Sequence, residues 1–171
     1  MTKPQGHTLV ELLVSLAILA ILLSTAAPAL SSMAESNKTT SAVNQMLGAI
    51  QYTRSSAVIS HQQAILCPGQ TACTNTSDWS DSVLIFQDRN GNERLDQDEP
   101  QLRHERLPDG YAWNWSSFRK LPHIIYQQDG TTQAANGTLT LCKKGKPLQQ
   151  IVISLAGRVR QQTASSSALC H

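Results

Sequence analysis

Between Leu9 and Leu30 the chain carries a single charged residue, Glu11, in a run that otherwise contains Leu, Ile, Val and Ala with a few Ser and Thr residues and one Pro. A run of about 20 apolar residues is long enough to cross a bilayer as a helix. A carboxylate within such a segment is costly in lipid, so its presence indicates a function. The sequence therefore predicts a membrane-spanning helix in which Glu11 has a role other than anchoring.

A short leader, residues 1–6, precedes this run and ends in Gly6. A secretory signal peptide has its small-residue cleavage site after the apolar region. Cleavage after Gly6 would instead leave the apolar helix on the mature protein. An ordinary membrane anchor is the alternative interpretation. The combination of Gly6, Glu11, an uninterrupted apolar helix and Pro28 resembles the N-terminal signal of type IV pilins and of the pseudopilins of type II secretion.

The resemblance implies how this N-terminus is processed and used. A prepilin peptidase would cut after Gly6, and the new terminus, His7 where the family usually has Phe, would be N-methylated. Glu11 would be required for assembly with other major and minor pilins, because a buried carboxylate can be neutralised by the free amine of a neighbouring subunit. The expected location is the inner membrane, with a single pass and a periplasmic globular domain, and the pilus fibre.

Apolar residues continue to recur at helical spacing beyond Pro28, although the sequence becomes polar. Such a stripe is typical of a helix that packs one face on a globular core. We therefore expect one helix over residues 8–60, with Pro28 as the place for a bend. Residues 7–30 would form its transmembrane half, and residues 31–61 its amphipathic half. The stripe contains Val43, Met46, Leu47, Ile50, Ala57 and Val58.

From residue 63 onward the pattern changes to short β-like runs separated by turn residues. Short strands at close spacing favour antiparallel sheets, so the predicted fold class is α+β, with a β-rich domain over residues 62–171. This arrangement is similar to the GspH/FimT branch of the pilin family, in which two antiparallel sheets lean on the C-terminal half of the helix. The expected strands are residues 64–67, 82–87, 101–106, 124–126, 137–142 and 149–154, with 158–161 as a further candidate.

The four cysteines, Cys67, Cys73, Cys142 and Cys170, all lie beyond the membrane segment. An even number in a translocated domain indicates two disulfides, and four cysteines allow three connectivities. We favour the local pairing of Cys67 with Cys73 and of Cys142 with Cys170. A zinc site is the alternative, but the spacing offers no second close pair of cysteines.

Residues 88–99 imitate part of a calcium-binding loop. Oxygen-bearing side chains at Asp88, Asn90, Asn92, Asp96 and Glu99 occupy steps 1, 3, 5, 9 and 12 of such a loop. The glycine required at step six is replaced by Glu93, however, and no helical pattern flanks the segment. We therefore expect a connecting loop between two strands, with bound calcium as the alternative.

A second candidate site follows the apolar strand expected over residues 149–154. Gly157 can adopt a turn conformation that other residues resist, and in an extended chain Arg158 and Arg160 would project from the same face. Two adjacent guanidinium groups suit neighbouring phosphates. The motif Gly-Arg-x-Arg resembles the signature with which FimT-type minor pilins bind DNA. The resemblance assigns DNA contact to Gly157, Arg158 and Arg160.

Other basic residues extend this candidate. Lys143, Lys144 and Lys146 form a basic turn that would lie at the tip of a hairpin, at the end opposite Gly157. Arg119 and Lys120 are weaker candidates. Because nothing in the sequence suggests a recognition helix, we expect sequence-independent binding to phosphates that is weak for one subunit and strongly salt-dependent.

The composition limits other functions. The formal net charge is +2, so DNA binding must come from a local patch. Aromatic residues make up 5% of the chain, which argues against a surface built for stacking bases. No catalytic, cofactor or metal pattern is recognisable, and the histidines are expected to lie on the surface: His61, His104, His123 and His171.

The predicted function is that of a minor type IV pilin that binds double-stranded DNA for uptake in natural transformation. The alternative is a structural minor pilin or pseudopilin that primes assembly of a type IV pilus or of a type II secretion pseudopilus without binding DNA. An adhesin is a third interpretation, although no ligand pocket is recognisable in the sequence.

Overall fold

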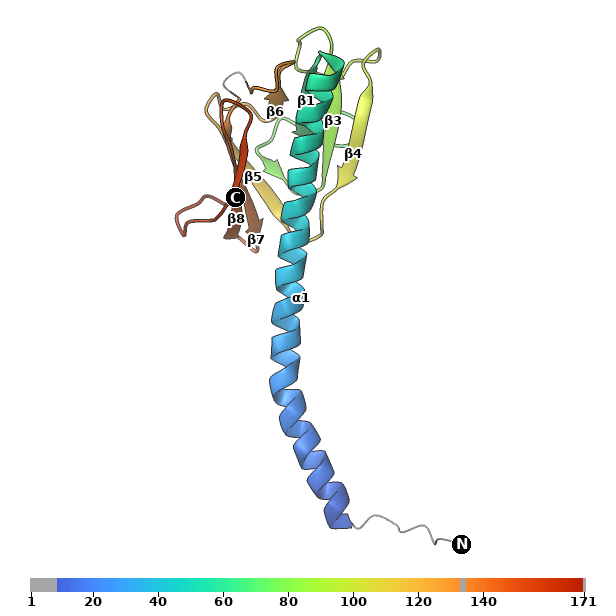
Figure 1. Ribbon diagram of the computed structural model, residues 1–171, viewed down its shortest axis with the longest axis vertical. Helices are drawn as coiled ribbons and strands as arrows, with labels where there is room; N and C mark the ends of the chain where they lie inside the picture. Colours follow the sequence, from blue (N-terminus) through green and yellow to red (C-terminus); the bar gives the residue numbers. More distant parts are fainter. Residues whose placement is uncertain (1–8, 133–134, 171) are drawn as a thin grey trace, which may run out of the picture. The chain divides into compact units, whose positions relative to one another are not determined.

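The computed structural model describes residues 9–132 and 135–170 (Figure 1). Gly6, His7 and His171 lie outside the described residues. The chain divides into two compact units, Met1–Thr40 and Ser41–His171. A single helix, α1, covers Leu9–Ser60 and continues through Pro28, so the predicted long helix is confirmed over its described length.

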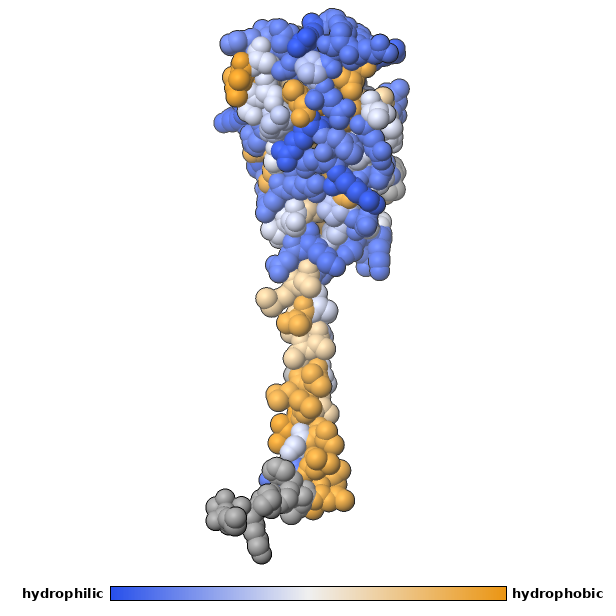
Figure 2. Space-filling model, turned by 90° about the vertical axis from the view of Figure 1, so that its right-hand side faces the viewer, coloured by the Kyte–Doolittle hydropathy of each residue, from blue (hydrophilic) through white to orange (hydrophobic). Residues whose placement is uncertain are grey.

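The described part of the first unit consists of the apolar stretch of α1. Its large side chains are exposed, for example Leu12 at 58% and Ile21 at 66%, and Figure 2 shows apolar residues covering this stretch. Among the described residues, α1 is the one helix long and apolar enough to cross a membrane. Exposed Leu and Ile side chains in such numbers fit a lipid environment.

The second unit contains two antiparallel sheets. The four-stranded sheet has the order β4-β3-β1-β6, and the five-stranded sheet has the order β2-β5-β7-β8-β9. This arrangement is the predicted α+β fold with two sheets against one helix. The strands in the described residues are β1 (Gln63–Pro68), β2 (Asp78–Trp79), β3 (Ser82–Asp88), β4 (Gln101–Arg106), β5 (Ala112–Ser117), β6 (Ile124–Tyr126), β7 (Gly137–Lys143), β8 (Lys146–Ile153) and β9 (Val159–Thr163).

The main core lies between α1 and both sheets, and from residue 41 onward α1 runs alongside the strands (Figure 1). Met46 and Ile50, four residues apart on the helix, are fully buried in the same core as Ile85 of one sheet and Leu139 of the other. The predicted stripe is therefore the packing face of α1. Val58 is an exception, because it is 42% exposed at the end of the helix.

The opposite face of the four-stranded sheet carries a smaller core. Ile65, Leu84, Phe86 and Ile125 are buried there, and Leu95 of the β3–β4 loop packs against them. The central strands β1 and β3 are thus buried on both faces, which explains why they are continuously apolar rather than alternating.

Six of the expected strands are present, within a few residues of the predicted bounds, and the further candidate after Gly157 is present as β9. Strands β2 and β5 were missed. In β5 the consecutive residues Trp113, Asn114 and Trp115 are all buried, so the two-residue alternation that indicates a strand is absent. Asn and Ser in this segment look like turn residues in the sequence.

Both disulfides of the favoured pairing are present. Cys67 and Cys73 are joined with their Cα atoms 5.5 Å apart, and Cys142 and Cys170 are joined with their Cα atoms 5.9 Å apart. The first closes a small loop after β1. The second ties the C-terminal segment to β7.

Candidate nucleic-acid interface

Strands β8 and β9 are joined by a tight turn over residues 154–158. The Gly157 amide donates to the Ser154 carbonyl at 2.8 Å, and the Ser154 amide donates to the Arg158 carbonyl at 2.9 Å. The Arg158 amide in turn donates to the Ser154 hydroxyl at 3.1 Å. These bonds hold the backbone of Arg158 in place directly before β9.

Gly157 is buried and has a φ of +73°, a conformation that strongly favours glycine. A Cβ atom at this position would overlap the Gly130 carbonyl oxygen and would lie 3.0 Å from the ring of Tyr126. The Tyr126 hydroxyl donates to the Gly157 carbonyl at 3.4 Å. Burial raises the pKa of Tyr126 to about 12, so the hydroxyl keeps the proton that it donates.

Arg158 and Arg160 are both exposed, whereas Val159 between them packs against the main core. Val159 pairs with the buried Ile153, and Arg160 pairs with Val152. Since side chains alternate between the faces of a strand, both guanidinium groups lie on the face opposite the core. We refer to this face as the outer face of the five-stranded sheet.

A third arginine lies near this turn, and it was not identified as a candidate from the sequence. Arg54 of α1 is half-buried and donates from Nη2 to the Ala156 carbonyl at 3.4 Å. The turn that contacts Gly157 also carries an acidic residue, Asp129, which is exposed. Hydrogen bonds from the amide and hydroxyl of Thr131 lower the pKa of Asp129, so the turn that packs against Gly157 carries an ionised carboxylate.

The lysines lie at the other end of the β7–β8 hairpin. Lys144 and Gly145 form its turn with φ values of 50° and 72°, as expected of a two-residue hairpin loop. Lys143 is half-buried, with its ammonium 4.7 Å above the Tyr111 ring. The eight-residue strand β8 separates this turn from Ser154, and its first and last residues are about 23 Å apart. The structure therefore does not bring the lysines together with Arg158 and Arg160.

Arg119 and Lys120 lie at the same end of the sheet as the arginines. Ser117 pairs with Gly137, Gly137 pairs with Ile153, and Ile153 pairs with Val159, so these four residues form one row across the sheet. Three strand spacings separate the ends of the row, about 14 Å. We refer to this end of the sheet as the arginine end and to the end with Lys144 and Lys146 as the lysine end.

The β3–β4 loop is closed by its own hydrogen bonds. The buried Asp88 accepts from the amides of Gly91 at 2.7 Å and Glu93 at 2.8 Å, and the buried Glu99 accepts from the Arg89 amide at 2.7 Å. Among the described residues, no group of three or more His, Cys, Asp or Glu side chains is placed to hold a metal ion. The loop joins two antiparallel strands, as the connecting-loop interpretation predicts.

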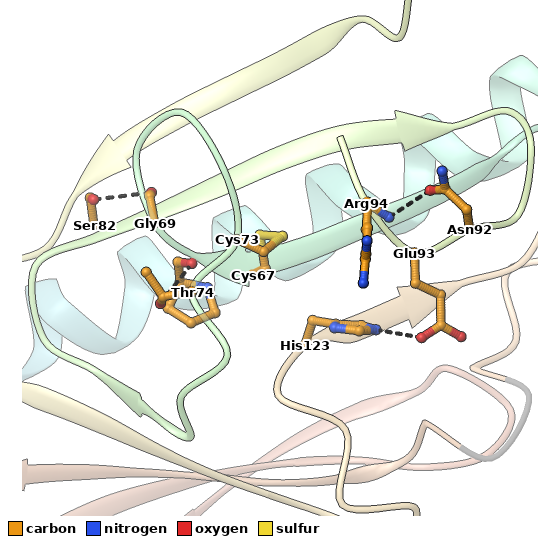
Figure 3. Close-up of a disulfide and its surroundings, with 10 residues drawn as sticks. Cys67, Gly69, Cys73, Thr74, Ser82, Asn92, Glu93, Arg94 and His123 are labelled. Atoms are coloured by element: carbon orange, nitrogen blue, oxygen red, sulfur yellow. Dashed lines mark hydrogen bonds and ion pairs between the residues drawn. A yellow bond between two sulfur atoms is a disulfide. The ribbon is translucent and has the colours of Figure 1, made fainter. Parts of the chain in front are cut away.

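Glu93 has a φ of 62° and contacts a histidine that was expected on the surface. His123 is 6% exposed, and its Nε2 lies 3.2 Å from Glu93 Oε2 (Figure 3). The prediction of a surface residue was wrong for His123 because its loop folds under the β3–β4 loop. Burial lowers the pKa of His123, and the carboxylates of Glu93 and Asp88 partly oppose this effect. His61 and His104 are exposed.

A cavity of about 530 Å³ lies beside this pair. It is lined by the disulfide loop at Cys73, by the β3–β4 loop from Asn92 to Asp96, and by residues 121–123. Figure 3 shows Arg94, Glu93 and His123 beside the Cys67–Cys73 disulfide. The cavity is on the opposite side of the four-stranded sheet from the main core.

Comparisons with known proteins agree with this fold. The family model described as type II transport protein GspH matches residues 42–157, and a prokaryotic N-terminal methylation motif matches residues 1–27. None of the curated proteins compared with the chain matches it.

The chain is also similar to the type IV minor pilin FimU of Pseudomonas aeruginosa in two crystal forms. In the first, the TM-score is 0.55 with 20% identity, over 77% of this chain and 96% of FimU. In the second, the TM-score is 0.58 with 21% identity, over 80% of this chain and 95% of FimU. At this level of identity the similarity establishes the fold.

Proposed function

The chain belongs to the GspH family and is a minor pilin or pseudopilin, and we propose that it captures DNA by binding phosphates with Arg158 and Arg160. The observation that carries this proposal is the fixed β8–β9 turn, which places two exposed guanidinium groups on one face of the sheet. Side chains two residues apart on a strand are separated by about 6.7 Å. Over that distance a DNA strand presents more than one phosphate.

Arginine suits this role because its planar guanidinium can donate two hydrogen bonds to one phosphate. Contacts of this kind position a protein on DNA without reading its sequence. The binding is therefore sequence-independent, weak for one copy and strongly salt-dependent. Several copies in one fibre, or neighbouring pilins, would raise the avidity.

The geometry supports a DNA surface that is limited to the arginine end. Gly157 shapes the turn, and Arg158 and Arg160 make the contacts. Lys144 and Lys146 would reach a different part of the duplex because about 23 Å of strand separates them from the turn. Lys143 contributes to packing against Tyr111. The partner is double-stranded DNA that is taken up in natural transformation.

The N-terminal region delivers this surface to the pilus. A prepilin peptidase cuts after Gly6, the new terminus at His7 is methylated, and the apolar stretch of α1 anchors the subunit in the inner membrane with its β-rich domain in the periplasm. Glu11 then pairs with the amine of a neighbouring pilin during assembly. The protein has a binding and structural role and is not an enzyme.

A second candidate function is structural, and the type II transport family match favours it. In that case the subunit primes a type IV pilus or a type II secretion pseudopilus without contacting DNA. The two candidates share the N-terminus and the fold, so only the arginine end distinguishes them.

The test uses the full chain in a non-ionic detergent and measures its binding to labelled duplex DNA at low salt. We expect the double variant Arg158→Gln, Arg160→Gln to lose most of the affinity of the parent. The matched control, Arg89→Gln with Arg106→Gln, removes the same charge from two exposed arginines outside the outer face. If the parent does not bind, or if all three proteins bind equally, the DNA proposal is wrong and the structural role remains.

A further inference from the structure

We propose that Phe118 is a stacking platform for an unpaired DNA base, so that the arginine end binds double-stranded DNA most tightly where a base of one strand is unpaired. This inference rests on the proposed DNA binding and identifies the form of DNA that the site takes. Base stacking on aromatic side chains beside a cationic groove is the usual way in which proteins hold single strands without sequence preference.

Phe118 is 79% exposed, directly after β5. Among the described residues of the second unit, it is the one aromatic side chain that is largely exposed, since the three tryptophans are buried. A large ring in water costs hydrophobic free energy. The low aromatic content argues against an extended stacking surface, but one ring in the right place is sufficient for one base.

The register of the sheet places Phe118 in line with Arg158. The Phe118 amide donates to the Asn136 carbonyl at 3.0 Å, which extends the pairing of β5 with β7 by one step. The Ser154 amide donates to the Arg158 carbonyl at 2.9 Å, which extends the pairing of β8 with β9. Phe118 and Arg158 are thus at opposite ends of one row, about 14 Å apart across three strand spacings.

The two side chains also share a face. Trp113 and Trp115 point into the main core, so Ser116 and Phe118 fall on the outer face by the two-residue alternation. Arg158 and Arg160 lie on the same face. Ser116 is exposed, and Thr138 and Val152 on the strands between are half-exposed, so this part of the face is open to a ligand.

By contrast, the C-terminal segment covers the outer face near the lysine end. Cys142, on the same face, is joined to Cys170, which holds the C-terminal segment there. Thr140 is 5% exposed and Asn114 is 8% exposed near that end. The open area is therefore confined to the part of the face that has Phe118 at one side and the two arginines at the other.

The cations on both sides of the open area suit a single strand. Arg119 and Lys120 directly follow Phe118 and are exposed, and Arg158 and Arg160 lie across the sheet. A base stacked on Phe118 would have its flanking phosphates near Arg119 and Lys120, and the strand would cross the sheet to reach Arg158 and Arg160, about 14 Å away. Asp129 is on the turn that contacts Gly157, and this turn meets the arginine side of the site rather than Phe118.

The test compares three probes for the full chain in a non-ionic detergent: a short thymidine oligonucleotide, the same backbone with abasic sites, and a blunt duplex. For Phe118→Ala we expect at least about a five-fold loss of affinity for the thymidine oligonucleotide, as for the loss of one stacked base. The affinities for the abasic backbone and for the blunt duplex should not change, because neither probe offers an unpaired base to the ring. Phe118→Trp should retain the affinity of the parent, and Phe118→Leu should lose it as Phe118→Ala does, because leucine is apolar but not flat.

A control tests an exposed apolar residue at the same end. Leu155 is 57% exposed, and Leu155→Ala should leave all three affinities unchanged. If the Arg158→Gln, Arg160→Gln variant weakens all probes but Phe118→Ala weakens none, stacking is wrong while DNA binding stands. If Phe118→Ala weakens the abasic backbone equally, stacking is also wrong. If neither variant changes any affinity, the proposed function itself fails.

Discussion

Gly157 and Gly130 are packed so closely that a Cβ atom on Gly157 would overlap the carbonyl oxygen of Gly130. The β8–β9 turn therefore rests directly on the turn that follows β6. The positions of Arg158 and Arg160 depend on this contact, because both residues follow the turn immediately. The glycine of the Gly-Arg-x-Arg motif thus has a steric function, and the DNA contact that we propose belongs to the arginines.

Replacing Gly157 with Ala should destabilise the protein and misplace the arginines. The left-handed conformation alone costs an alanine about 1 to 2 kcal/mol, and the overlap with backbone adds to this cost. The control is Gly110→Ala, which has a φ of +80° but no atom within 4 Å of the added Cβ. Chemical unfolding should show a larger loss for Gly157→Ala than for Gly110→Ala. Equal losses would show that the contact with Gly130 is unimportant.

The salt dependence of DNA binding should separate the two basic groups. Each phosphate contact contributes about 0.9 to the slope of log affinity against log salt, so Arg158→Gln with Arg160→Gln should lower the slope by about 1.8. Lys144→Gln with Lys146→Gln should leave the slope for a very short duplex unchanged, because the lysine end lies about 23 Å away. A fall in slope for the lysine variant on that duplex would show that both ends bind it together.

The stability of the β-rich domain should fall as the pH drops below the ordinary pKa of histidine. Burial lowers the pKa of His123 in the folded state, so the unfolded chain binds a proton at a higher pH than the folded chain does. The unfolded state gains from protonation over that interval, and stability present at pH 8 is partly lost by pH 5.5. Melting temperatures of the parent and of His123→Gln at both pH values test this, and the variant should lose less. A parent and variant with the same pH dependence would exclude His123 as the cause.

Removing the two disulfides should have unequal effects. Cys142 and Cys170 are separated by 28 residues, and Cys67 and Cys73 by 6. In the chain-entropy model the longer loop contributes about 3 to 4 kcal/mol and the shorter about 2 kcal/mol. Paired Cys→Ala variants should show this order in chemical unfolding. In each pair one cysteine is buried and the other is half-buried, so the loss of packing is comparable, and a reversed order would contradict the prediction.

Glu11→Gln should retain membrane insertion but reduce incorporation into the fibre. The neutral amide keeps the size and shape of the side chain and removes the charge that would neutralise a neighbouring terminal amine. Immunoblots of sheared fibres and of membrane fractions measure the two quantities separately. Ser15→Ala, one turn further along α1, is the matched control. Normal incorporation of the Glu11 variant would remove the assembly role.

The long helix and most strands could be predicted because their signals are local. Apolar spacing in α1 and short apolar runs in β1, β3 and β6 reflect burial that each segment shows by itself. Strand β5 could not be found in this way, because Trp113, Asn114 and Trp115 are buried together. The burial of His123 was not predicted for a related reason, because it depends on contact with the β3–β4 loop, which is distant in the sequence.

The candidate site shows the same division between local and distant effects. The shared face of Arg158 and Arg160 follows from two-residue alternation in one strand. The contribution of Arg54 depends on how α1 packs on the Ala156 carbonyl, and the alignment of Phe118 with Arg158 depends on the register of four strands. No spacing within one segment contains such information.

The edge strand β4 affects how one copy of the protein can meet another. It lies at the border of the four-stranded sheet, where an unpaired backbone invites the strands of another molecule. Its sequence is Gln-Leu-Arg-His-Glu-Arg, and most of these side chains are exposed. Charged side chains on an edge discourage pairing between sheets. At this edge the four-stranded sheet therefore resists pairing with the sheet of another copy.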